Sequence, residues 1–83
     1  MNEESTEYFD HVQKILSKVL NIDPSQIKSS SNITMDLGAD SLDMVEIIMT
    51  IDEEIGCYIS DKQIEKIEKV IDLENAIRLN MLL

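Results

Sequence analysis

The chain has 83 residues, which suffice for one domain with one modest hydrophobic core, so we expect residues 1–83 to form a single domain. Apolar residues make up 43% of the sequence, which favours a globular fold over a disordered acidic tail. The formal net charge of −10 disfavours binding to nucleic acid and to anionic membranes, and it favours docking onto basic protein surfaces.

The residue types favour helices. Two glycines, one proline, two tyrosines and one phenylalanine are too few for the turns and strands of a sandwich or barrel. The composition therefore predicts an all-α fold. The single cysteine, Cys57, excludes a disulfide framework, and the acidic start at residues 1–4 lacks the apolar segment of a signal peptide. No stretch is long enough to span a membrane, so we expect a cytoplasmic protein.

The first predicted helix ends near Leu20–Asn21, because Asp23 precedes Pro24 and is disfavoured in a helix. Its polar side includes His11, which we expect to be solvated. A long loop follows from about Asn21 to Asp40. The first helix is defined by apolar residues at helix spacing, namely Tyr8, Val12, Ile15, Leu16 and Val19. The loop should be held on the bundle by its own apolar residues, Ile22, Ile27, Ile33, Met35 and Leu37.

The second predicted helix runs from Ser41 to about Ile55, with Asp40 as its N-cap and Gly56 as its stop signal. Ser60 and Gln63 have the spacing of a capping box, which predicts a short third helix. We expect Ile64 and Ile67 to point inward from it. A last helix begins around residues 69–72, carries Leu73, Ala76 and Ile77, and ends within residues 78–83.

The second helix has two apolar faces. At about 100° per residue, one arc suits a core-facing stripe and comprises Met44, Ile47, Ile48, Ile51 and Ile55. Leu42, Val45 and Met49 form a second stripe on nearly the opposite side, bordered by Glu46 and Glu53. An exposed apolar strip between carboxylates is typical of a protein-docking surface. Burial on both sides, or a homodimer seam, are the alternatives.

The sequence lacks the features of several catalytic and metal sites. His11 is the only histidine, and the residues around Ser41 do not form a Gly-x-Ser-x-Gly elbow, so a catalytic triad is not expected. The spacing of Asp36 and Asp40 does not match a calcium loop, and no metal site is expected. We expect a protein that is not an enzyme. Ser41 begins a helix, where a serine is usually just a cap but where a phosphate ester is also favoured.

The run Asp36-Leu37-Gly38-Ala39-Asp40-Ser41-Leu42-Asp43 resembles the phosphopantetheine attachment motif of acyl carrier proteins. The resemblance implies a four-helix bundle with a short third helix and a long first loop. It also implies that a phosphopantetheinyl transferase attaches a covalent 4′-phosphopantetheine arm to Ser41, making the chain a phosphoprotein, with Asp40 contacting the transferase. The arm would carry growing fatty acyl chains as thioesters between the enzymes of fatty acid biosynthesis.

The resemblance further assigns surfaces to a chain that we expect to be monomeric. Basic patches of partner enzymes would contact Leu42, Val45, Glu46, Met49, Glu53 and Glu54. Acyl chains would enter a cavity lined by Ile47, Ile48, Ile51, Ile64 and Ile67. Ser60, the bulky Ile71 and the apolar end at residues 81–83 depart from the family pattern. Cys57 should be a partly buried thiol without a role. Polyketide, peptide or D-alanine carriers, and an unmodified interaction subunit, are the alternatives.

Overall fold

The computed structural model describes residues 7–82, which fold into α-helices and one short 3-10 helix with no β-strand among them. The expected all-α fold with a short third helix and a long first loop is confirmed. The predictions about residues 1–4 and Leu83 lie outside the described residues. The elements, in chain order, are α1 (Phe9–Leu20), η1 (Pro24–Gln26), α2 (Ser41–Ile55), α3 (Asp61–Glu65) and α4 (Val70–Leu82).

Local signals in the sequence explain where the helices begin and end. Asn21 closes α1 in a left-handed conformation (φ 57°), which Asn tolerates better than most residues. Gly56 closes α2 in the same way (φ 76°), as predicted from its type. Ser60 and Gln63 form the predicted capping box at the start of α3. The η1 turn begins at Pro24, a position that proline's fixed φ suits, but the sequence did not predict it.

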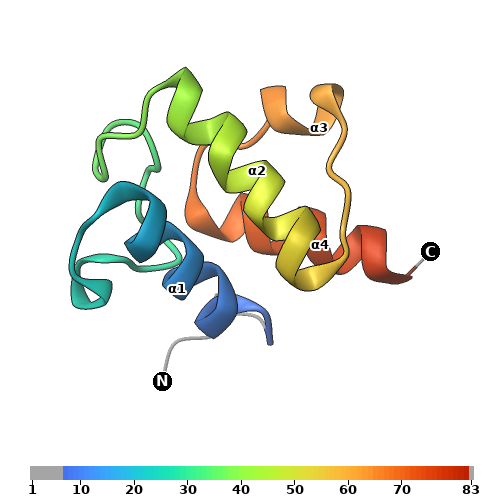
Figure 1. Cartoon of the computed structure of the whole chain (residues 1–83), viewed down its shortest axis with the longest axis horizontal. Helices are drawn as coiled ribbons and strands as arrows, with labels where there is room; N and C mark the ends of the chain where they lie inside the picture. Colours follow the sequence, from blue (N-terminus) through green and yellow to red (C-terminus); the bar gives the residue numbers. More distant parts are fainter. Residues whose placement is uncertain (1–6, 83) are drawn as a thin grey trace.

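The helices enclose one aliphatic core. α1 packs against both α2 and α4, and Figure 1 shows α2 running between the first loop on one side and α3 on the other. Burying these side chains removes apolar surface from water, which is the main force that holds the helices together. The core side chains are Val12, Ile15, Leu16, Ile27, Ile33, Ala39, Ile47, Ile48, Ile51, Cys57, Ile59, Val70, Leu73 and Ile77.

The first loop lies on the bundle as expected, with one exception. Ile27 and Ile33 are buried, and Ile22 and Leu37 pack against the core. Met35 is 82% exposed, so the prediction that it anchors the loop was wrong. Its backbone N–H is held by the side chain of Asn32 in a turn, which leaves the Met35 side chain in solvent.

Backbone hydrogen bonds join the first loop to the start of α4. The Ile33 N–H donates to the Glu68 carbonyl, while the Val70 and Ile71 N–H groups donate to the carbonyls of Ser31 and Ser29, all at 2.9 Å. The bonds from Val70 and Ile71 satisfy N–H groups that the start of α4 leaves without an intrahelical partner. The loop that precedes Ser41 is thus attached to an element some thirty residues later in the chain.

Two smaller predictions need adjustment, and the apolar end of the chain can be placed. Ile64 and Ile67 point toward the core but are only half-buried, because α3 is short and Ile67 follows its end. Cys57 is 2% exposed and therefore fully rather than partly buried, and this burial raises the pKa of its thiol. Met81 and Leu82, at the apolar end of the chain, are exposed on the last turn of α4.

Candidate functional site

Ser41 is the first residue of α2 and its side chain is exposed. Asp40, not Ser41, is the N-cap: its Oδ1 accepts the Asp43 N–H at 2.9 Å, and the Asp43 Oδ2 accepts the Asp40 N–H at 3.1 Å. In this capping box, two carboxylates accept the backbone N–H groups of Asp40 and Asp43 at the helix start. The usual reason for a serine at a helix start is therefore absent here, and the Ser41 hydroxyl is left available for chemistry.

A hollow of about 450 Å³ lies beside Ser41, between the start of α2 and the start of α3. We call it the Ser41 hollow. Met44, Val45 and Ile64 give it an apolar floor, while Thr34 and Asp61 supply polar atoms at its edge. A flexible chain attached to the Ser41 oxygen would have both apolar surface and hydrogen-bonding groups within reach, so the site fits a phosphopantetheine arm. The sequence did not point to Thr34 or Asp61, because only the fold brings them to α2.

The isoleucines expected to line an acyl cavity lie in different surroundings, and the cavity itself stays a prediction. Of the five isoleucines assigned to it, Ile64 lines the Ser41 hollow. Ile67 lines a separate hollow of about 250 Å³ between α3 and α4. Ile47, Ile48 and Ile51 line neither one and are buried in the packed core. Periodicity identified an inward-facing stripe correctly, but it cannot distinguish a filled core from an open cavity.

The second apolar stripe of α2 is exposed. Leu42 is 78% exposed, Val45 56% and Met49 57%, and Glu46 and Glu53 beside them are also exposed. The alternative of a helix buried on both sides is therefore excluded. We call these five residues the α2 strip. An apolar strip that keeps carboxylates at its border has the composition of a surface that binds basic partners.

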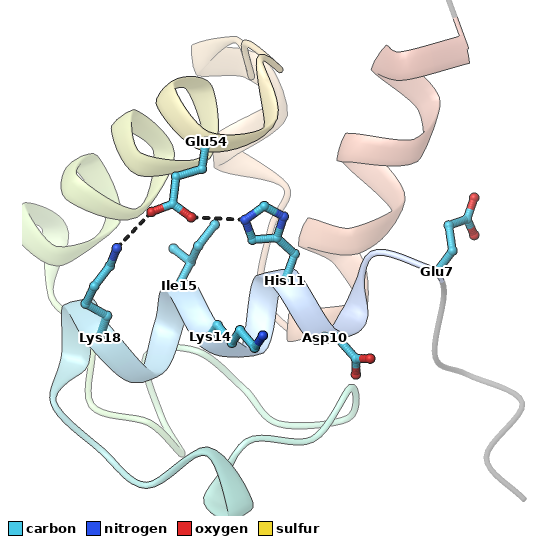
Figure 2. A pocket seen from close by; sticks show the side chains of 7 residues that line it. All are labelled: Glu7, Asp10, His11, Lys14, Ile15, Lys18 and Glu54. Carbon is cyan, nitrogen blue, oxygen red and sulfur yellow. Dashed lines mark hydrogen bonds and ion pairs between the residues drawn. The ribbon is translucent and has the colours of Figure 1, made fainter.

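Glu54, by contrast, lies away from the α2 strip. Figure 2 shows its carboxylate between two side chains of α1, with Oε2 2.8 Å from the Lys18 Nζ and Oε1 3.0 Å from the His11 Nε2. Hydrogen bonds from Lys18 and then from His11 lower the pKa of the Glu54 carboxyl. Glu54 thus joins two helices, and its contact with partner enzymes stays a prediction. The His11 side chain is 43% exposed, in line with the expected solvated position, and its Nε2 also contacts Glu54.

Glu54, Lys18 and His11 also line a third hollow, of about 510 Å³, along α1. Glu7, Asp10, Lys14 and Ile15 complete its wall. It lies at the C-terminal end of α2, where Glu54 is thirteen residues, or about 20 Å along the helix, from Ser41. This hollow is separate from the Ser41 site, and its three acids and three bases largely balance one another.

Comparisons with known proteins agree with the geometry at Ser41. Residues 10–77 match the family model described as "Phosphopantetheine attachment site". The "Acyl carrier protein" of Helicobacter pylori (strain G27) is 42% identical over 74 residues, which cover 89% of this chain and 95% of the relative. Those of Helicobacter acinonychis and Wolinella succinogenes are 42% and 39% identical and cover 89% and 87% of this chain. Each of these two alignments covers 95% of the relative.

This chain belongs to the acyl carrier protein family. Acyl carrier proteins are carriers and not catalysts, so the expectation that the chain is not an enzyme is confirmed. The family's cofactor is a covalently attached 4′-phosphopantetheine, and family membership implies interaction with acyl chains and with biosynthetic enzymes. Between residues 7 and 82, no helix of this acyl carrier protein is long and apolar enough to cross a membrane.

Proposed function

We propose that Ser41 is the attachment residue of the 4′-phosphopantetheine arm, and that the chain delivers growing fatty acyl groups to the enzymes of fatty acid biosynthesis. The main support for attachment at Ser41 comes from the start of α2, where Asp40 caps the helix and leaves the Ser41 hydroxyl exposed. When attached, the arm supplies a terminal thiol that holds acyl groups as thioesters. The name of the relatives, "Acyl carrier protein", supports the same role.

Attachment is a phosphodiester transfer from coenzyme A. The Ser41 Oγ forms a bond to the phosphorus that bears the pantetheine, the bond from that phosphorus to the adenosine bisphosphate portion breaks, and the hydroxyl proton passes to a base on the transferase. Magnesium on the transferase would balance the phosphate charge. The product phosphate stays anionic beside the N-terminal end of α2, where the helix dipole and free N–H groups favour negative charge.

Partner enzymes would bind the α2 strip. Its carboxylates, Glu46 and Glu53, attract a basic patch, while Leu42, Val45 and Met49 supply apolar contact. Asp40 lies at the same end of α2 as Ser41 and would meet the transferase. We infer that the protein acts as a cytoplasmic monomer, because the strip suits transient contacts with successive enzymes better than a permanent seam.

The test of attachment is the intact mass after co-expression with a phosphopantetheinyl transferase. The wild type should gain one phosphopantetheinyl group and Ser41→Ala none, while the neighbouring Ser31→Ala, a buried serine of the first loop, should still be modified. An unmodified wild type, under conditions that modify a control carrier, would contradict the proposal.

The test of pathway is the cargo. The protein should be isolated from its native cell and its acyl groups identified by mass spectrometry. Saturated and 3-hydroxy fatty acyl groups of several lengths would support fatty acid synthesis. Aminoacyl, D-alanyl or polyketide groups would place the carrier in one of the alternative pathways instead.

A further inference from the structure

Asp36 opens the attachment motif, yet it lies outside the α2 strip and contacts a residue of its own loop. Its Oδ2 accepts the Asn32 N–H at 2.8 Å. Its own N–H donates to the Asn32 carbonyl at 2.9 Å. Asn32 and Asp36 are thus joined by two hydrogen bonds, one donated by the backbone of each residue.

The Asn32 side chain organises the inside of the same turn. Its Oδ1 accepts three hydrogen bonds, from the Thr34 N–H at 3.1 Å, the Thr34 hydroxyl at 3.0 Å and the Met35 N–H at 2.8 Å. An Asn at the start of a turn commonly replaces a backbone acceptor in this way. With Asp36 closing the far side, residues 32–36 have one defined conformation although the side chains of Thr34, Met35 and Asp36 are exposed.

The turn is connected to Ser41 through a short series of backbone bonds. The Gly38 N–H donates to the Thr34 carbonyl and the Ala39 N–H to the Ile33 carbonyl, each at 3.1 Å. Gly38 has φ +79°, which a residue with a side chain rarely adopts. Ala39 is buried, so only Asp40 lies between this anchored residue and Ser41.

We infer that Asn32 and Asp36 are positioning residues for arm transfer, holding the backbone beneath Ser41 so that its oxygen meets the phosphorus in one geometry. This inference rests on the proposed attachment at Ser41. A displacement of about 1 Å at a reacting atom can cost a hundredfold in rate. Asp36 therefore acts as a hydrogen-bond acceptor within the chain, and its negative charge is not what the transferase reads.

The variants Asp36→Ala and Asp36→Asn separate these two roles. Both remove the charge, but Asn keeps an oxygen that can accept the Asn32 N–H. With a phosphopantetheinyl transferase and coenzyme A, Asp36→Ala should lower kcat roughly 10- to 100-fold. Its KM should stay within about twofold, because the α2 strip that docks is unchanged. Asp36→Asn should retain kcat within about threefold of the wild type.

Two controls keep a general loss of folding apart from positioning. Met35→Ala, in the same turn and 82% exposed in the wild type, should leave kcat and KM unchanged. Each variant is assayed at a temperature where its far-UV circular dichroism matches the wild type. Independently of any transferase, amide hydrogen exchange at Gly38 and Ala39 should quicken at least tenfold in Asp36→Ala and stay near wild type in Asp36→Asn.

The outcomes distinguish the inference from the function on which it rests. Equal losses of kcat in Asp36→Ala and Asp36→Asn would show that the charge matters, and a raised KM alone would show a docking role; either result overturns the inference. Unchanged kcat in a folded Asp36→Ala would also overturn it, while attachment at Ser41 stands. If the arm is absent from wild type, or persists in Ser41→Ala, the proposed function fails first and the inference with it.

Discussion

The Ser29 hydroxyl donates a 2.8 Å hydrogen bond to the Glu74 Oε2, and both residues are fully buried. The bond joins the first loop to the middle of α4. It lies close to the backbone bonds that Val70 and Ile71 donate to the loop, so side-chain and main-chain contacts support the same junction. A carboxyl group buried in an aliphatic bundle is costly unless its hydrogen bonds are kept.

Removing the Ser29 hydroxyl should therefore destabilise the fold. We expect Ser29→Ala to lower the free energy of unfolding by about 1–3 kcal/mol, because the buried carboxyl loses a hydrogen bond. Urea denaturation measures the change. The double variant Ser29→Ala/Glu74→Leu should recover part of the loss, since replacing both polar partners by apolar groups is often nearly neutral. A double variant less stable than Ser29→Ala would contradict this account.

Glu54 should make stability depend on acidic pH. Because Lys18 and then His11 lower the pKa of its carboxyl in the folded state, the folded protein favours the ionised form. The stabilisation is present above the ordinary carboxyl pKa of about 4.3 and is lost as the pH falls through the lowered value. Glu54→Gln should accordingly show a shallower loss of stability between about pH 5 and 3, measured by urea denaturation.

Lysine variants of α1 provide the matched comparison. Lys18→Met should remove most of the pH effect of Glu54, since its hydrogen bond is the largest cause of the lowered pKa. Lys14 lines the same hollow but makes no ion pair with Glu54, so Lys14→Met should leave the acid profile unchanged. Equal effects of both lysine variants would mean that net charge, and not the pairing, sets the profile.

Charge reversal on the α2 strip should weaken docking without unfolding the helix. Glu46→Lys with Glu53→Lys should slow association with a basic partner enzyme by roughly tenfold or more, because the two carboxylates steer the encounter. Surface plasmon resonance measures the rate, and circular dichroism checks helix content. Glu65→Lys with Glu68→Lys makes the same change in net charge on exposed residues outside the strip and should have a smaller effect. Insensitivity of the rate to added salt would argue against steering.

Gly56 should resist substitution for a conformational reason. Its φ of +76° is left-handed, and a Cβ there would meet no atom of a more distant residue within 4 Å, so strain and not a clash is the cost. We expect Gly56→Ala to lower the free energy of unfolding by about 1–2 kcal/mol. Gly56→Asn should lose less, because Asn tolerates this conformation. Thermal unfolding compares the two, and equal stability of wild type and Gly56→Ala would refute the strain argument.

Local and periodic features were predictable from the sequence. Asp40 and Asp43 at the start of α2, Gly56 at its end, and Ser60 with Gln63 at the start of α3 act over four residues or fewer, so the chain does not need its final fold to reveal them. The stripe of Leu42, Val45 and Met49 opposite the core face followed from helix geometry, and its predicted exposure is confirmed. The stripe could be recognised as lying outside the core because a small bundle buries only one face of a helix.

Contacts between distant segments could not be predicted from motifs, caps and periodicity. Glu54 is paired with Lys18 and His11 across helices, Glu74 with Ser29 across 45 residues, and Thr34 and Asp61 meet at the Ser41 hollow. Each depends on the angle and register at which helices pack, which periodicity does not contain. The same limit explains why the sequence could not separate Ile64, which lines the Ser41 hollow, from the buried Ile47, Ile48 and Ile51.

Ser41 shows both sides of this division. The sequence by itself determined the attachment motif, the helix that begins at Ser41 and the acidic, apolar strip that follows, because motif, cap and periodicity are properties of neighbouring residues. Only the tertiary structure decided that a hollow lies beside the Ser41 hydroxyl and that the loop beneath it is hydrogen-bonded to α4. Those features arise from packing and from hydrogen bonds between segments far apart in the chain.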